Sequence, residues 1–259
     1  TMRKISSNMA SVESGEEFEV QTHVGGEDDI NVGNGDDIVI AGVGVDYINW
    51  DRDGENPSPR LGQDSGSDVI VGDSGEAVFN TYSGVEALSE IRSIDDTNGG
   101  YDKIWTDGGF DVVIGGVGND DIDAGTDDSR DIVLGDNGEV IFFDNPHEVV
   151  RKIESTTTDS GGSDEIIVGG GDDIVIAGFG ADFVNYTRQT ERVEGDTGSD
   201  YILGDSGKAI FDYDQSNLSG IVREIRTIAP EHGSQDLIYA ADGPDVVFGG
   251  SAGDTIDGG

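Results

Sequence analysis

A nine-residue repeat constrains the fold of this chain more than any other feature. In fifteen blocks of nine residues, the sixth residue is always Asp and the eighth is always Ile or Val. The fourth residue is Gly in twelve blocks, and the exceptions are Ser129, Ser234 and Ala252. The blocks begin at residues 23, 32, 41, 63, 97, 106, 115, 126, 159, 168, 177, 195, 231, 240 and 249. Such a repeat predicts a one-dimensional stack in which each unit depends on its neighbours.

The invariant aspartates are the candidate functional residues. Ordinary turns also contain Gly-Asp pairs, but unrelated turns would not keep one register fifteen times. We therefore expect one shared role for these residues: Asp28, Asp37, Asp46, Asp68, Asp102, Asp111, Asp120, Asp131, Asp164, Asp173, Asp182, Asp200, Asp236, Asp245 and Asp254.

The best-preserved block is Gly-Gly-Val-Gly-Asn-Asp-Asp-Ile-Asp at 115–123. It fits the pattern Gly-Gly-x-Gly-x-Asp-x-U-x, where U is a large aliphatic residue. This pattern resembles the RTX calcium-binding repeats of secreted bacterial proteins, and the resemblance extends over all fifteen blocks. It implies a six-residue turn, a three-residue strand, and two blocks per coil of a right-handed parallel β-roll. The expected fold class is therefore all-β, a β-solenoid with calcium-binding turns.

The residue types agree with calcium as the bound ion. Glycine permits positive φ, Asp supplies an anionic oxygen, and the β-branched eighth residue fills a core. Calcium accepts six to eight oxygen ligands, whereas turns without cysteine and with few histidines suit zinc or copper poorly. The resemblance implies that two blocks form one coil, and each turn then stacks on the turn two blocks along. At least seven calcium sites follow, from the pairs Asp28/Asp46, Asp37/Asp68, Asp102/Asp120, Asp111/Asp131, Asp164/Asp182, Asp173/Asp200 and Asp236/Asp254. Further sites, including one that uses Asp245, could span the junctions between modules.

Two departures from the repeat pattern affect individual sites. Ser234 and Ala252 replace glycine in the last module and would resist positive φ, which makes the Asp236/Asp254 site the least secure. Insertions at 50–62, 124–125 and 186–194 precede or adjoin the fourth blocks and could distort the sites of the even-numbered blocks.

The charge of the chain narrows the range of partners. It contains 55 acidic and 14 basic residues, for a formal net charge of −41. Such a chain repels nucleic acid and anionic membrane surfaces and attracts cations. Its 42 glycines would favour disorder by composition alone, and ion binding can offset that tendency. No apolar run is long enough for a membrane span, so we expect no direct membrane insertion.

The nonapeptides are grouped into larger modules. We predict the end of a preceding module and a linker at 1–22, module 1 at 23–96, module 2 at 97–158, module 3 at 159–230, and a partial module 4 at 231–259. Together they form one continuous solenoid, which we interpret as an excerpt from a longer tandem array. The expected protein partners are flanking repeats of the same chain and identical chains in a filament.

A recurring hairpin follows the fourth block of each full module. Gly-Asp-Ser-Gly-Glu-Ala-Val-Phe at 72–79 recurs at 135–142 and 204–211, and each copy leads to a second strand-like stretch near 91–94, 150–153 and 225–228. We predict β-hairpins with variable tips at 82–87, 144–148 and 213–221. The outward places of even-numbered blocks are apolar, so one sheet needs a cover. The hairpins are expected to fold over that sheet, with a neighbouring chain as the alternative target.

Three functions compete for such a chain. A calcium-stabilised extracellular structural array, which forms a fibre, stalk or surface layer and folds after export, is favoured because long modules with their own hairpins repeat. The alternatives are an adhesin module that binds a ligand through the hairpin tips and an RTX segment attached to a secreted enzyme. His23, His147 and His232 lie in different modules without a recurring nucleophile, so we expect no enzymatic activity. The expected location is outside the cell or on its surface.

Overall fold

The computed structural model describes residues 2–6, 20–22, 25–50, 65–144, 149–214 and 219–259. His23, His147 and the tip residues 145–148 and 215–218 lie outside the described residues. Within the described ranges the chain is all-β, with 23 strands and no helix. The search of these ranges for a helix able to cross a membrane found none.

Two parallel sheets form the coil. The first coil sheet contains, in order, β2 (Val20–Thr22), β4 (Ile38–Ile40), β6 (Val69–Val71), β10 (Val112–Gly116), β12 (Ile132–Asp136), β16 (Ile174–Gly178), β18 (Tyr201–Asp205) and β22 (Val246–Phe248). The second contains β3 (Asp29–Ile30), β5 (Tyr47–Ile48), β9 (Lys103–Trp105), β11 (Asp121–Asp123), β15 (Glu165–Ile167), β17 (Phe183–Val184), β21 (Leu237–Tyr239) and β23 (Thr255–Asp257). Even-numbered blocks supply the first sheet and odd-numbered blocks the second, so two blocks form one coil.

The eighth residues of the blocks fill the space between the two coil sheets. Thirteen of the fifteen belong to one buried cluster, while Val247 packs at its border and Ile256 is 47% exposed. The strands pair in register, so that Ile70 lies opposite Val113 and Ile104 opposite Ile122. Stacking of identical places therefore produces one continuous apolar core, as the periodicity predicts.

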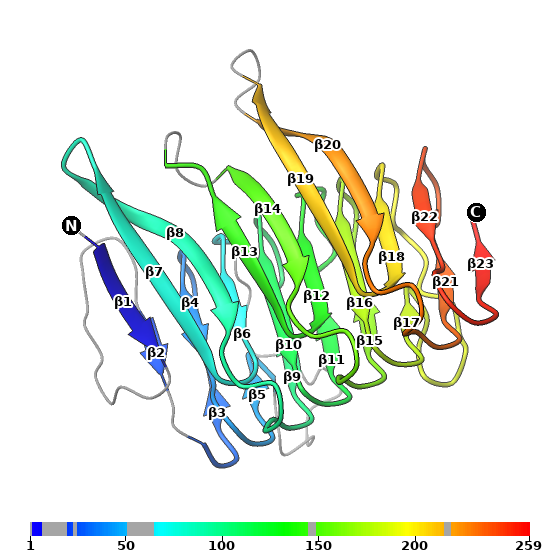
Figure 1. Ribbon diagram of the computed structural model, residues 1–259, viewed down its shortest axis with the longest axis horizontal. Coiled ribbons are helices and arrows are strands. Elements are labelled where there is room, and N and C mark those ends of the chain that lie inside the picture. The colour runs from blue at the N-terminus through cyan, green and yellow to red at the C-terminus, as the bar shows by residue number, and fades with distance from the viewer. Residues whose placement is uncertain (1, 7–19, 23–24, 51–64, 145–148, 215–218) are drawn as a thin grey trace.

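A third sheet is antiparallel and consists mainly of hairpins. This hairpin sheet has the order β1 (Met2–Ser6), β7 (Gly75–Tyr82), β8 (Val85–Ser93), β13 (Gly138–Phe142), β14 (Val150–Ser155), β19 (Gly207–Asp214) and β20 (Ser219–Thr227). Figure 1 shows the hairpins β7–β8, β13–β14 and β19–β20 side by side along the stack of coils. Successive hairpins pair with one another through β8 and β13 and through β14 and β19.

The hairpin sheet packs on the outer face of the first coil sheet. A second buried cluster combines Ile114, Leu134 and Ile176 of the coil with Phe79, Ile91 and Val140 of the hairpins. The first coil sheet is thus apolar on both faces, as expected for strands buried between two layers. Val246 and Phe248, in the last even-numbered block, are each 38% exposed.

Candidate metal centre

The invariant aspartates form two ladders along the turns of the coil. In the odd-block ladder, the backbone N–H of each Asp donates to Oδ1 of the next, over distances of 2.8–3.2 Å. The order is Asp28, Asp46, Asp102, Asp120, Asp164, Asp182, Asp236 and Asp254. The seven pairs derived from the sequence are neighbours in this ladder or in its counterpart on the other side of the coil.

The even-block ladder has the same geometry. It runs through Asp37, Asp68, Asp111, Asp131, Asp173, Asp200 and Asp245, with N–H to Oδ1 distances of 2.7–3.1 Å. Both ladders continue across the module junctions, from Asp46 to Asp102 on one side and from Asp68 to Asp111 on the other. Asp245, which has no partner within its own module, lies next to Asp200.

The second carboxylate oxygen of the ladder aspartates is the candidate ligand atom for a cation. In several aspartates of both ladders, Oδ2 is buried and accepts no hydrogen bond from the described residues. They include Asp46, Asp102, Asp120, Asp164, Asp173, Asp182 and Asp236. A buried carboxylate oxygen without a partner is costly unless a cation or a proton compensates it. Hard anionic oxygens next to backbone carbonyls are the donor set that calcium prefers, so these residues fit that ion.

Burial changes the acidity of the ladder. It raises the pKa of Asp131 to about 9, and the nearby charges of Asp111 and Asp173 act in the same direction. Burial likewise raises the pKa of Asp173 and Asp236 to about 8 and that of Asp46 to about 7. The ionised form is therefore disfavoured in the absence of a cation, and bound calcium would reverse this effect.

The turns approach one another too closely for side chains at the fourth place. A Cβ on Gly44 would overlap the Gly26 carbonyl, and a Cβ on Gly118 would overlap the Gly100 carbonyl. Ala252 occupies this place with φ +71°, a left-handed conformation that alanine disfavours. Ser234 is not among the non-glycine residues with positive φ. The Asp236–Asp254 hydrogen bond is nevertheless the longest in its ladder, at 3.2 Å.

The insertion at 186–194 does not interrupt the ladder, contrary to the expected distortion. The Asp173 N–H lies 2.9 Å from Asp200 Oδ1 across this insertion, and the Asp111 N–H lies 2.9 Å from Asp131 Oδ1 across the two-residue insertion at 124–125. The insertion instead folds back on the coil. Its Arg188 guanidinium lies 3.0 Å from Asp121 Oδ1 and donates to the Asp120 carbonyl oxygen at 3.0 Å. Residues 51–62 of the insertion at 50–62 lie outside the described residues.

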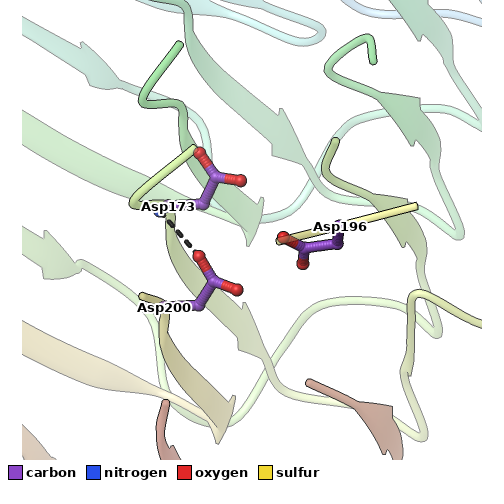
Figure 2. Close-up of side chains that lie close together, drawn as sticks. All are labelled: Asp173, Asp196 and Asp200. Carbon is purple, nitrogen blue, oxygen red and sulfur yellow. Dashed lines mark hydrogen bonds between the residues drawn. The ribbon is translucent and has the colours of Figure 1, made fainter. Parts of the chain in front are cut away.

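One turn of the even-block ladder contains a third carboxylate. Asp173, Asp196 and Asp200 are all buried and each offers an oxygen within 4.8 Å of the others (Figure 2). Asp196 accepts hydrogen bonds from the Gly198 N–H at 3.1 Å and from Asn185 Nδ2 at 3.2 Å, which orient its carboxylate. Burial raises the pKa of Asp196 as well. Three convergent carboxylates make this the most strongly anionic candidate site in the described even-block ladder.

The sequence analysis did not identify Asp196 as a ligand, although a signal for it exists. Asp196 is the second residue of the fourth block in its module, and Asp64 and Asp127 occupy the same place in the other full modules. Asp64 lies outside the described residues. Asp127 is exposed and accepts the N–H groups of Ser129 and Gly109, both at 3.0 Å, so the same place serves a different role in module 2.

Comparison with family models agrees with the repeat pattern. The model of the RTX calcium-binding nonapeptide repeat matches four segments of the chain, at residues 96–131, 158–184, 187–208 and 233–259. A search of curated proteins and a search of solved structures found no match. The segment at 187–208 contains Asp200 of the even-block ladder, and each of the other three matched segments contains aspartates of both ladders.

Proposed function

Because this chain is built from RTX calcium-binding nonapeptide repeats, we propose that it is a calcium-stabilised extracellular structural array. It would form a segment of a fibre, stalk or surface layer and fold on binding calcium after export. Its role is mechanical and not enzymatic. Its partners are calcium ions, flanking repeats of the same chain, and identical chains in a filament.

One observation carries the proposal: the two ladders are continuous along the coil, and their aspartates are buried except for half-buried Asp28, Asp245 and Asp254 near the ends. A row of closely spaced buried carboxylates opposes compaction when no cation is present. A calcium ion between two turns would offset the charge of two aspartates and join one coil to the next. Folding and ion binding are therefore one process in this proposal.

The proposed architecture is a right-handed coil in which the hairpins are a constant part of every module. Right-handed crossovers are the rule for parallel strands. The hairpins contribute Phe79, Val140 and Phe211 to the cluster on the first coil sheet, which supports their role as its cover. A layer of this kind would stiffen the array along its length, because neighbouring hairpins share hydrogen bonds.

The array proposal is tested by a calcium titration of this chain, followed by far-ultraviolet circular dichroism, with magnesium as the control ion. We expect a coil-to-β transition at about 10⁻⁴–10⁻³ M calcium, the range of extracellular modules, and a weaker response to magnesium, which retains its water more strongly. Light scattering in the same titration separates an assembling fibre from a monomeric spacer. A β signal that persists in a chelator would overturn the calcium-dependent part of the proposal.

An adhesin role is the second candidate, and one observation favours it. Tyr82 and Val85, at the tip of hairpin β7–β8, are 47% and 51% exposed. Exposed aromatic and aliphatic side chains at a loop tip are suited to contact a ligand, although loop tips also tolerate such residues without a role. Replacing both with Ser should abolish adhesion of the chain to its target surface if the tips bind, and should leave the calcium transition unchanged.

A further inference from the structure

Each full module contains, at one recurring place, a buried aspartate that lies outside both ladders. Asp73, Asp136 and Asp205 are the second residues of the Gly-Asp-Ser/Asn-Gly segments that connect the first coil sheet to each hairpin. We call them the root aspartates. Their exposed fractions are 0%, 2% and 1%, so these carboxylates are as deeply buried as those of the ladders.

The root aspartates reach into the following module. Asp136 accepts the Gly162 N–H at 2.8 Å through Oδ1 and the Phe179 N–H through Oδ2. Asp205 repeats this arrangement with the N–H groups of Ser234 and Ser251. Asp73 accepts the Val117 N–H at 2.6 Å through Oδ2, and its carboxylate also interacts more weakly with the Gly100 N–H, the equivalent of Gly162.

A ladder carboxylate oxygen without a hydrogen-bond partner in the described structure also lies next to the glycine that precedes each root aspartate. A Cβ on Gly72, the residue before Asp73, would lie 2.6 Å from Asp102 Oδ2 and 2.6 Å from the Gly115 carbonyl oxygen. The glycines before the other two root aspartates, Gly135 and Gly204, face Oδ2 of Asp164 and Asp236 and the carbonyls of Ala177 and Gly249 in the same way. Oδ2 of Asp102, Asp164 and Asp236 is buried and accepts no hydrogen bond from described residues.

Three copies of one arrangement in a single chain indicate a built site and not an accident of packing. Each copy brings together two buried carboxylates and a backbone carbonyl, with a glycine that leaves space beside them. The hydrogen bonds place the root carboxylates at the same turns. Asp136 accepts the N–H groups of Gly162, two residues before Asp164, and of Phe179, two residues after Ala177, and Asp73 accepts that of Val117, two residues after Gly115. Two adjacent buried carboxylates must be compensated by a cation or by protons, and together with a carbonyl oxygen they form the donor set that calcium prefers.

We propose that each root aspartate, together with the first-block ladder aspartate of the next module and the facing carbonyl, binds a calcium ion that joins a hairpin to the following coil. The three sites would be Asp73 with Asp102 and Gly115, Asp136 with Asp164 and Ala177, and Asp205 with Asp236 and Gly249. This inference rests on the proposed calcium-dependent function. It adds a class of site between hairpin and coil to the sites between stacked turns.

The test is the number of calcium ions bound by a triple variant, Asp73→Asn, Asp136→Asn and Asp205→Asn. Equilibrium dialysis with radioactive calcium at saturation measures this number for the variant and for the unmodified chain. We expect one ion fewer for each root aspartate removed, while circular dichroism at saturating calcium still reports a β-rich coil. The matched control is Glu76→Gln, Glu139→Gln and Glu154→Gln, which removes the same charge from the hairpin sheet and should leave the number of bound ions unchanged.

The outcomes separate this inference from the proposed function. If the unmodified chain binds no calcium, the proposed function fails and this inference fails with it. If the unmodified chain binds calcium and the triple variant binds the same number of ions, only the root sites are excluded. If the triple variant does not fold, the three single variants replace it: each should lose one ion, and an unchanged number in every single variant overturns the inference.

Discussion

The two oxygens of a ladder aspartate have separate roles. Oδ1 accepts the backbone N–H of the preceding rung and so holds adjacent turns in register, as in the 2.8 Å contact between the Asp102 N–H and Asp120 Oδ1. Oδ2 of Asp120 is buried without a hydrogen-bond partner in the described structure, which makes it available to a cation. One residue type thus provides both the stacking contact and the candidate ligand, and this explains why asparagine or glutamate would be a poor substitute.

Substitution Asp120→Asn should separate these two roles. Its side-chain carbonyl can still accept the Asp102 N–H, but the anionic ligand is lost, so we expect at least a tenfold increase in the calcium concentration at the folding midpoint, about the size of effect seen when metal sites are perturbed. In a chelator the same variant should be more stable than the unmodified chain, because a buried charge has been removed. The calcium titration and urea unfolding measure the two effects, and Asp96→Asn, an exposed position, is the control. An unchanged midpoint would show that Asp120 is not a ligand.

Asn185 illustrates how a residue outside the ladders supports them. It adopts φ +51°, and its side chain accepts the Val168 N–H at 3.0 Å and donates to the Tyr239 carbonyl and to Asp196, both at 3.2 Å. Asn49 has the same conformation and the equivalent contacts to Val32 and Trp105 in module 1. Asparagine tolerates the left-handed region better than most residues and adds local hydrogen bonds.

We expect Asn185→Ala to reduce the free energy of unfolding by about 2–4 kcal/mol, from the left-handed backbone and the lost buried hydrogen bonds. Asn185→Gly retains the favourable backbone conformation and should cost less, which separates the two causes. Urea unfolding at a fixed saturating calcium concentration provides the comparison. Equal costs for both variants would mean that the backbone conformation contributes nothing.

At the scale of elements, the coil strands are too short to be stable alone. Strands of two to five residues gain stability by pairing in register with the strands before and after them, and by sharing the core between the two coil sheets. The hairpins are longer and form a layer of their own, with ion pairs such as Arg92–Glu76 at 2.6 Å and Lys208–Glu154 at 2.9 Å. The second of these pairs links successive hairpins, so the layer is continuous between modules.

The contribution of the hairpin layer can be measured at Phe79. This side chain is fully buried in the cluster shared by the hairpins and the first coil sheet, so Phe79→Ala should lower the free energy of unfolding by about 3–5 kcal/mol at saturating calcium. Tyr82→Ala, on the same strand but 47% exposed, should change it by less than about 0.5 kcal/mol. If both variants unfold alike, the hairpin does not pack on the coil in solution.

At the scale of the whole molecule, charge and ion binding determine the folded state together. The net charge of −41 opposes a compact state, and the ladders concentrate part of that charge in buried turns. Without calcium, protons are the remaining means of neutralising these groups. Burial raises the pKa of Asp131 to about 9, of Asp173 to about 8 and of Asp46 to about 7, from an ordinary value of 3.8.

The sign of the resulting pH dependence is opposite in the two conditions. In a chelator, the folded state binds more protons than the unfolded chain between pH 4 and about 9, so stability should be greatest near pH 4 and fall as the pH rises through about 7 to 9. With calcium present, protons compete with the ion, and the folding midpoint should shift to lower calcium concentration as the pH rises. Circular dichroism across this pH range, with and without calcium, tests both trends. Stability in the chelator that increases with pH would contradict this account of the ladders.

The repeat register and the family resemblance that it carries were together sufficient to predict the coil. The resemblance implies that the eighth residues share one core and that the sixth residues stack in adjacent turns, and the structure has both arrangements. The apolar outward residues of even-numbered blocks also indicated which sheet would be covered. These features follow from contacts between equivalent places of a local pattern, which a single sequence can reveal.

Contacts between residues that occupy different positions of the repeat, or that lie outside it, are determined only by the tertiary structure. Asp196 joins Asp173 and Asp200 because the insertion before it returns the chain to the same turn. The root aspartates bond to amides of the next module, and hairpins separated by whole blocks pair into one sheet. Ala252 accepts a left-handed conformation that its own preference opposes. In each case the partner is set by where the stacked coils bring distant segments together, and no local pattern contains that information.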